Sequence, residues 1–154
     1  FNLPMSSFSR GAAQQTNLTA ANHTIAANIC YEIVYSHYIR KQQTPETQFI
    51  LTLSNDTWFG ASHGPHQHLE IARMRAIELG KPLIRATNNG ISALIDHQGH
   101  SILTLPQFEA IAAEADVAHV EGTTYFTRFG AIPTWILALI FASLSFIRRN
   151  RSKM

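Results

Sequence analysis

The hydrophobic and polar positions of the first hundred residues predict alternating strands and helices. Strands are predicted over 22–29, 48–55 and 82–88, and two shorter strands flank a turn at Gln98–Gly99. Helical spacing of apolar residues predicts helices over 30–42 and 63–81, and Gly80 ends the second one. Asn89–Gly90 predicts a hairpin turn. Because helices and strands alternate first and hairpins follow, the pattern indicates an α/β body with a mixed sheet.

The end of the chain has a different pattern. From Phe129 to Ile147, nineteen successive residues carry no charge, close to the about 20 apolar residues that a membrane-spanning helix needs. Its apolar residues surround the helix instead of forming one stripe. A basic tail follows, and basic flanks of a spanning helix tend to stay in the cytoplasm. We therefore expect a body at 1–128, a transmembrane helix at 129–147 and a cytoplasmic tail at 148–154. The alternative is a buried core helix of a soluble domain.

Composition supports this division. Charged residues make up 14% of the chain, against about 25% in a typical soluble domain. The net charge of +2 argues against a strong nucleic-acid binder. Residues 1–147 hold eight basic and ten acidic residues, whereas 148–154 hold four basic ones. The positive excess therefore belongs to the tail and not to the body.

Cys30 is the only cysteine, which excludes an internal disulfide and a cysteine-only zinc site. It stands where a predicted strand passes into a predicted helix, a junction that exposes nucleophiles on sharp turns. The dipole and N–H groups of the following helix would favour a thiolate and hold a substrate oxyanion. The alternative is a small buried hydrophobic residue. The local pattern leaves both interpretations open.

Several separated motifs agree in order and spacing. They are LPMSSF at 3–8, CYE at 30–32, SNDTWFG at 54–60, GPHQH at 64–68, ARMRA at 72–76, ELG at 78–80 and RATNNGIS at 85–92. Together they resemble the carbon–nitrogen hydrolase (nitrilase) superfamily and, within it, the apolipoprotein N-acyltransferase family. The resemblance implies part of a four-layer α-β-β-α sandwich, an α/β fold, followed by one C-terminal transmembrane helix.

The resemblance also implies an activity and a site. The activity is transfer of an acyl chain from a phospholipid, through a cysteine thioester, to the α-amino group of the lipidated N-terminal cysteine of bacterial lipoproteins. It implies Cys30 as the nucleophile, Glu32 as a supporting acidic residue, and Tyr31 and Trp58 on the substrate side. It implies no cofactor, no metal and no nucleic acid; the partners are a phospholipid donor, an apolipoprotein acceptor and the membrane.

The family also uses a Glu and a Lys that precede the LPMSSF segment, and this sequence carries neither. We therefore expect a C-terminal portion of such an enzyme, inactive alone because Cys30 lacks its base and completed by a missing N-terminal portion. Half a sandwich would expose an apolar sheet face. The resemblance implies a bacterial inner membrane, with the body periplasmic and the C-terminus cytoplasmic. Two alternatives remain: a membrane-tethered amidase or nitrilase of the superfamily, and an inactive truncated chain.

Other polar residues have simpler interpretations. His63, His66 and His68 form an HxxHxH cluster without an evident fourth ligand, so we expect polar roles and not a metal site. Asn55 and Asp56 end a strand, where they order the Cys30 loop or form a turn.

Three arginines are candidates for contacts with lipid phosphates: Arg73, Arg75 and Arg85. Glu70–Arg73 and Arg75–Glu78 have helical i,i+3 spacing. For Arg73 and Arg75 we therefore favour internal ion pairs.

Overall fold

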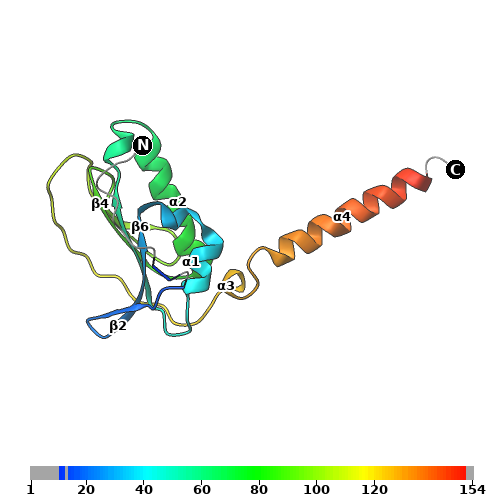
Figure 1. The fold of residues 1–154 in the computed structure, drawn as a ribbon, viewed down its shortest axis with the longest axis horizontal. Helices are drawn as coiled ribbons and strands as arrows, with labels where there is room; N and C mark the ends of the chain where they lie inside the picture. Colours follow the sequence, from blue (N-terminus) through cyan, green and yellow to red (C-terminus); the bar gives the residue numbers. More distant parts are fainter. Residues whose placement is uncertain (1–10, 13, 152–154) are drawn as a thin grey trace.

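The computed structural model of the chain describes residues 11–12 and 14–151, so the LPMSSF motif at 3–8 lies outside the described residues. It consists of an α/β body from which one long helix projects (Figure 1). The elements are β1 (Leu18–Ala20), β2 (His23–Ile29), η1 (Cys30–Val34), α1 (Ser36–Gln42), β3 (Phe49–Asn55), η2 (Thr57–Phe59), α2 (Gly64–Leu79), β4 (Leu83–Asn88), β5 (Ala93–Ile95), β6 (Ser101–Thr104), α3 (Tyr125–Phe129) and α4 (Ile132–Arg151).

The strands form one mixed sheet in the order β1-β2-β3-β4-β5-β6. The central strands β2, β3 and β4 are parallel, and the outer pairs are antiparallel. Parallel neighbours need crossover connections, which η1 with α1 and then α2 provide. Both crossovers lie on the same side of the sheet (Figure 1). The predicted mixed sheet is confirmed, and one of its faces is covered by helices.

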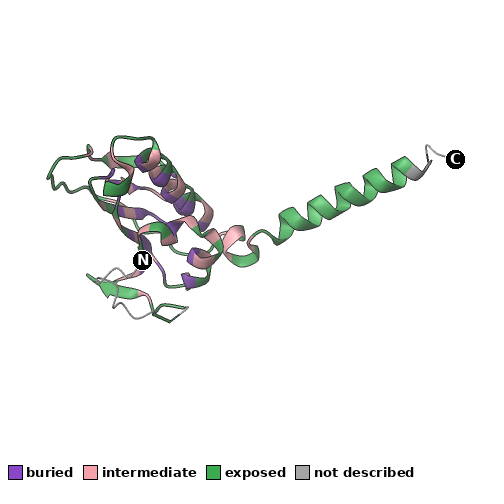
Figure 2. Cartoon of the chain, turned by 45° about the horizontal axis from the view of Figure 1, so that its top comes forward, coloured by how far each residue is buried: buried purple, intermediate pink, exposed green. Residues whose placement is uncertain are grey.

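The hydrophobic core lies between the sheet and these helices (Figure 2). Its fully buried members include Ile33 of η1, Ile39 of α1, Ile50 of β3 and Leu83 of β4. Full burial of one such side chain contributes about 1.5–3 kcal/mol. The core therefore fixes η1 and α1, which follow Cys30, firmly against the sheet.

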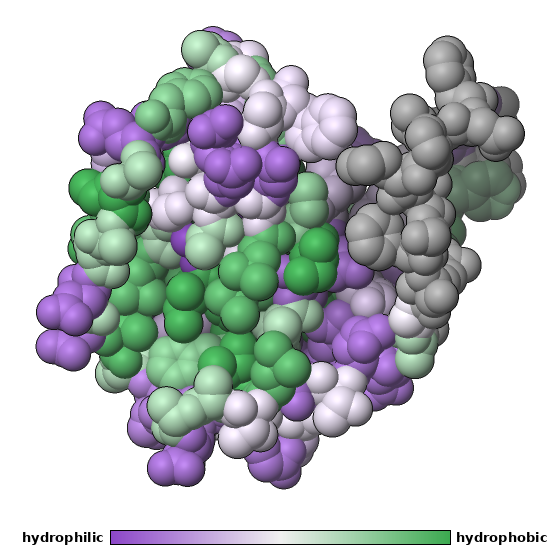
Figure 3. All heavy atoms as spheres, turned by 60° about the vertical axis from the view of Figure 1, so that its left-hand side comes forward, coloured by the Kyte–Doolittle hydropathy of each residue, from purple (hydrophilic) through white to green (hydrophobic). Residues whose placement is uncertain are grey.

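The opposite face of the sheet is apolar and open. Side chains alternate between faces, and the residues next to core positions point away from the helices: Ile25, Ala27, Ile29, Leu51, Leu53, Ile84 and Ala86. Ile29 is 59% exposed and Leu53 is 45% exposed. Figure 3 shows a hydrophobic patch on this side of the body. The expected open apolar face is thus present in the described part of the chain.

The predicted helix over 30–42 is wrong as one element. It is divided at Tyr35 (φ −87°, ψ 85°) into the 3-10 helix η1 and the α-helix α1. The Tyr35 N–H donates to the carbonyl of Glu32, while its own carbonyl accepts from Ile39 and begins α1. This division directs both Ile33 and Ile39 into the core. In one continuous helix the two side chains would point to different sides, because six residues span more than one and a half turns.

The remaining differences concern short elements. Strand β1 and helix α3 were not predicted. The predicted end of α2 is confirmed, because Gly80 adopts the left-handed conformation (φ 62°) that closes helices.

Helix α4 begins after a break at Gly130, whose φ is +57°. Among the described residues it is the one helix long and apolar enough to cross a membrane, over Ile132–Arg149, with a mean hydropathy of 1.4 and none of this window buried. Helix α3 joins it to the body, since Arg40 donates to the Thr127 carbonyl at 3.0 Å. The apolar helix is therefore attached to the body through a defined junction (Figure 1).

Candidate active site

Cys30 lies at a sharp turn at the carboxyl end of β2. Ile29 is still extended (φ −107°, ψ 119°), whereas Cys30 has φ +52° and is the first residue of η1. A positive φ costs a residue with a side chain roughly 1–2 kcal/mol, and strained nucleophile turns of this kind present a side chain at the edge of a sheet. The half-buried Cys30 therefore has the backbone geometry expected of a nucleophile.

The helix that follows Cys30 is shorter than predicted. Helix η1 has five residues and 3-10 geometry, and the aligned peptide dipoles of a long α-helix are absent from it. The predicted stabilisation of a thiolate by a helix dipole is therefore not supported. The side-chain contact of the Cys30 sulfur in the structure is with the Ser54 hydroxyl, at 3.4 Å.

Glu32 closes the Cys30 turn. Its Oε2 accepts a hydrogen bond from the backbone N–H of Ile29 at 2.7 Å, so the carboxylate bridges the residue before Cys30 to the residue two positions after it. A charged acceptor roughly doubles the strength of such a bond. Glu32 thus holds the strained turn in place.

A buried polar network lies beneath this turn, centred on Asp56. Its Oδ1 accepts from the Ser54 hydroxyl at 2.6 Å and lies 3.0 Å from His68 Nδ1. Its Oδ2 accepts from the guanidinium of Arg85 at 2.7 Å. The side chains of Asp56 and Arg85 are 0% exposed. The Ser54 hydroxyl also lies 3.4 Å from the sulfur of Cys30, which connects the network to the candidate nucleophile.

The charges of this network balance within it. Asp56 and Arg85 form a neutral pair, the arrangement that makes a buried charge tolerable. Burial, and next the charge of Arg85, lower the pKa of His68, although Asp56 and the Cys30 backbone oppose the shift. His68 is therefore neutral at pH 7, and its Nδ1–H is assigned as the donor to Asp56 because a carboxylate can only accept.

The NNG segment after β4 packs directly against this network. A Cβ at Gly90 would lie 2.5 Å from Oδ2 of Asp56, so only glycine fits there. Asn89 adopts φ 55°, but Gly90 has no positive φ, and the antiparallel pairing of β4 with β5 starts only at Arg85 and Ala93. The chain therefore reverses between antiparallel strands as predicted, but through a wider loop than the two-residue turn that Asn-Gly favours.

Tyr31 and Trp58 lie on the exposed side of the site. Trp58 belongs to η2, which follows β3, so it lies at the sheet edge where the parallel strands end and where α/β proteins place their sites. Trp58 is 86% exposed and Tyr31 is 54% exposed. Phe59 holds η2 to the body, with its ring centroid 6.2 Å from that of His68. Two aromatic rings, Tyr31 next to Cys30 and Phe59 of η2, thus lie 6.2 Å from the ring of His68, while Trp58 extends into solvent.

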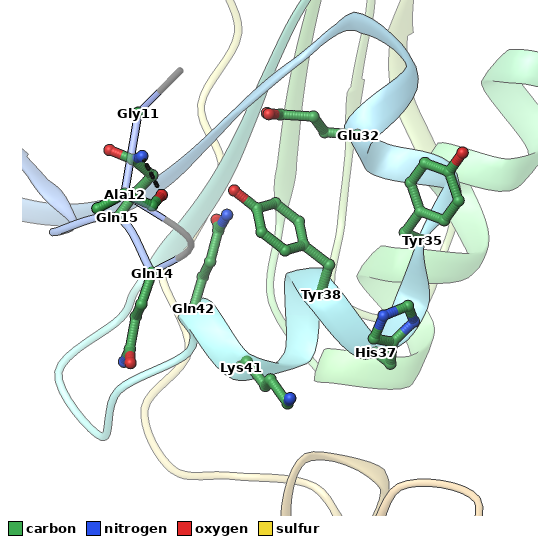
Figure 4. A pocket seen from close by; sticks show the side chains of 10 residues that line it. All are labelled: Gly11, Ala12, Gln14, Gln15, Glu32, Tyr35, His37, Tyr38, Lys41 and Gln42. Carbon is green, nitrogen blue, oxygen red and sulfur yellow. Dashed lines mark hydrogen bonds between the residues drawn. The ribbon is translucent and has the colours of Figure 1, made fainter.

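A cavity of about 830 Å³ lies beside the turn, between the described residues Gly11, Ala12, Gln14 and Gln15 on one side and α1 on the other. Tyr38 and Gln42 of α1 extend toward Gln14 and Gln15, and Glu32 lies at the η1 end of the cavity (Figure 4). Of the four predicted site residues, only Glu32 lines it.

The other candidate residues have structural roles. His63 and His66 are exposed while His68 is buried, and no group of potential ligands within the described residues could hold a metal ion. The two predicted helical pairs are confirmed, with Arg73–Glu70 at 2.6 Å and Arg75–Glu78 at 3.0 Å.

Arg85 was a candidate for contact with a lipid phosphate, and this interpretation is wrong because Asp56 binds its buried side chain. Asn55 makes the predicted turn, since its Oδ1 accepts from the Thr57 N–H at 3.2 Å. The Asp56–Arg85 pair itself was not predicted. The available signal was a charged residue among apolar ones in a central strand, because such a residue is seldom buried without a partner.

Comparison with known proteins gives the class first. The sequence profile of the carbon-nitrogen hydrolase family matches residues 3–125, so the chain belongs to this family. The fold agrees: an amidase from Nesterenkonia sp. has a TM-score of 0.52 at 19% identity, over 64% of this chain and 39% of that one. A carbon-nitrogen hydrolase from Helicobacter pylori has a TM-score of 0.53 at 13% identity, over 64% of this chain and 41% of that one.

Much closer relatives are known within the family. The apolipoprotein N-acyltransferase of Vibrio cholerae is 50% identical over 99% of this chain, and that of Photobacterium profundum is 52% identical over 98%. The matched regions make up 30% and 29% of those proteins. The chain thus spans about 30% of the length of the relatives it matches.

Proposed function

We propose that this chain forms the cysteine-bearing part of an apolipoprotein N-acyltransferase. The observation that carries the proposal is the turn at Cys30, where a positive φ, a Glu32 clamp and a buried polar network support one half-buried cysteine. The relatives at about 50% identity carry this activity in their names. The projecting apolar helix fits substrates that reside in a membrane.

The chemistry consists of two acyl transfers through Cys30. In the first, the thiolate attacks the ester carbonyl of a phospholipid, a thioester forms, and the lysophospholipid leaves with a proton. In the second, the α-amino group of the lipidated N-terminal cysteine of a lipoprotein attacks the thioester carbonyl. An amide forms, a proton leaves the nitrogen, and the thiolate is regenerated. A covalent intermediate divides one difficult step into two easier ones.

The remaining site residues have proposed roles that follow from their positions. Glu32 positions the nucleophile turn through the Ile29 N–H. Tyr31 and Trp58 contact the acyl chains or exclude water from the thioester, since both are large, aromatic and exposed beside the turn.

Part of the site lies outside this sequence in our proposal. The chain spans about 30% of its relatives, and its open sheet face has the apolar character of a face that packs against a second layer. We propose that the rest of the protein covers this face and supplies the base and the cation for the Cys30 reaction. The chain expressed by itself should then transfer no acyl group, because the thiol lacks its base.

We also propose the orientation and the boundaries. Residues 1–128 form the body on the periplasmic side of the bacterial inner membrane, 129–147 cross it, and the basic tail at 148–154 stays in the cytoplasm.

An assay with two arms tests the proposed function. The full-length protein that contains this sequence is reconstituted with phospholipid and offered a diacylated lipopeptide with a free amine, and in parallel a set of small amides. We expect phospholipid-dependent N-acylation of the lipopeptide, no ammonia release from the amides, and loss of acylation in Cys30→Ala. Ammonia release without lipopeptide acylation would instead identify an amidase.

A further inference from the structure

The hydroxyl of Ser54 lies between the candidate nucleophile and the buried network. Its Oγ is 3.4 Å from the sulfur of Cys30 and 2.6 Å from Oδ1 of Asp56. Ser54 is at the end of β3, on the face that looks toward the helices, and it pairs in register with Thr87 of β4. The serine therefore contacts the sulfur from the body side, opposite the exposed side from which a substrate approaches.

One hydroxyl proton cannot serve both neighbours at once. The short contact with Asp56 is typical of a hydroxyl that donates to a carboxylate, so in the thiol state the proton points to Asp56. The oxygen then offers a lone pair to the sulfur, and the thiol S–H donates to it. Loss of the thiol proton reverses the preference, because a thiolate is an acceptor and needs a donor.

We propose that Ser54 is a rotating hydrogen-bond donor that stabilises the Cys30 thiolate, and that Asp56 positions it. The proposal rests on the proposed use of Cys30 as a nucleophile, and it adds a residue of this chain to that chemistry. When Cys30 loses its proton, the Ser54 hydroxyl turns from Asp56 to the sulfur. No covalent bond forms or breaks in this rotation, because the hydroxyl only changes its hydrogen-bond acceptor from Asp56 to the sulfur.

The surroundings allow the rotation at low cost. When Ser54 turns away, Asp56 keeps the bonds from His68 Nδ1 and from the guanidinium of Arg85. Asp56, Arg85 and His68 are the ionisable groups of the network that Ser54 joins to Cys30, and Glu32 and Tyr31 are those of the Cys30 turn itself. Glu32 is engaged with the Ile29 N–H, so Ser54 is the uncharged donor that reaches the sulfur from the body.

The rotation assists both transfer steps. A thiolate must form before it attacks the phospholipid ester, and it must leave again when the amine attacks the thioester. The sulfur of the thioester carries no charge, so Ser54 returns to Asp56 in the intermediate. The hydrogen bond is therefore strongest in the states in which sulfur carries negative charge, which is the condition for a rate effect.

Alkylation of Cys30 tests the proposal without acyl transfer. The full-length protein is treated with iodoacetamide in detergent without substrates, and the modified Cys30 peptide is quantified by mass spectrometry at pH 7 and at pH 10. Iodoacetamide reacts with the thiolate. We expect Ser54→Ala to be alkylated about tenfold more slowly at pH 7, the effect of one hydrogen bond to a charged group. At pH 10 the two proteins should react at equal rates.

Three control variants isolate the hydroxyl. Ser54→Thr keeps the hydroxyl, so its alkylation rate at pH 7 should match that of the wild type. Ser54→Val has the shape of threonine without the hydroxyl, so it should react as slowly as Ser54→Ala. Because threonine and valine have the same shape, the ratio of their alkylation rates reports the hydroxyl even where both variants are less stable than the wild type. Thr52→Val removes a buried hydroxyl that has no hydrogen-bond partner, two residues earlier on the same face of β3, and should match the wild type.

Equal rates at pH 7 for Ser54→Thr and Ser54→Val would overturn the proposal. Alkylation of Thr52→Val as slow as that of Ser54→Val would also overturn the proposal, because loss of any buried hydroxyl from this face of β3 would then slow the reaction. A protein that fails the acyltransferase assay but shows the serine-dependent rate would refute only the proposed function, so the two failures can be told apart.

Discussion

The buried pair of Asp56 and Arg85 gives a prediction whose size follows from the structure. Asp56→Asn keeps the shape of the side chain but removes its charge, and it leaves the guanidinium without a counter-charge at a site where both side chains are 0% exposed. At 2.7 Å the attraction is about 6 kcal/mol for an effective dielectric constant of about 20. Asparagine still accepts one hydrogen bond, so the expected loss is about 3–5 kcal/mol, as for other broken buried pairs.

Hydrogen–deuterium exchange measures this loss locally. A loss of about 3–5 kcal/mol corresponds to a fall of about 10²–10⁴-fold in the protection of peptides that cover β3 and β4. The full-length protein is used in detergent at pH 7. The double variant Asp56→Asn with Arg85→Met should recover much of the protection, because no unpaired charge remains buried.

An exposed pair provides the matched control. Glu70→Gln removes a carboxylate from the 2.6 Å pair with Arg73, where the two side chains are 57% and 38% exposed. An exposed pair contributes at most about 1 kcal/mol, so protection should change by at most about fivefold. Protection in Asp56→Asn within the same fivefold range would refute the assignment of Asp56 as the centre of the buried network.

Three further predictions follow from neighbouring residues. The pKa of His68 is lowered in the folded protein by burial, so folding loses stability as the pH falls below about 6.5; thermal unfolding of His68→Asn should depend less on pH between 7.5 and 5. Gly90→Ala would place a Cβ 2.5 Å from Asp56, so the unfolding temperature should fall. Gly122 has open space around it, so Gly122→Ala should lower the unfolding temperature less, by the strain of its positive φ alone. Gly130→Ala should loosen the junction between α3 and α4, because its φ is +57° and Arg40 lies 3.1 Å from the added Cβ; faster proteolysis between body and helix would register this, and an unchanged rate would contradict it.

Regular elements with strong periodicity could be predicted from the sequence. Strands β2, β3 and β4 and helix α2 lie within two residues of their predicted bounds, because their apolar positions repeat and glycine and polar residues mark their ends. The prediction of one helix over 30–42 was wrong. The apolar positions there have helical spacing, but the strained φ of Cys30 and the burial of both Ile33 and Ile39 require a break at Tyr35. Such a break depends on packing against the sheet, which the spacing of apolar residues does not reveal.

The candidate site could be predicted only in its outline. The position of Cys30 at the end of a strand followed from local pattern, and family motifs pointed to Glu32, Tyr31 and Trp58. The pairing of Asp56 with Arg85 could not be derived, because it joins residues 29 positions apart whose strands must first be placed side by side. The contact of Ser54 with the sulfur has the same origin, since it depends on the parallel register of β2 and β3.

The most direct test of Cys30 as the acyl-carrying nucleophile is its chemical state during turnover. The full-length protein is mixed with phospholipid of one defined acyl chain, quenched in acid, digested and analysed by mass spectrometry. We expect the Cys30 peptide to carry the mass of that acyl chain, to lose it with hydroxylamine at neutral pH, and to lose it when the lipopeptide amine is added. N-acylation of the lipopeptide in a protein whose Cys30 never carries an acyl group would contradict the central claim.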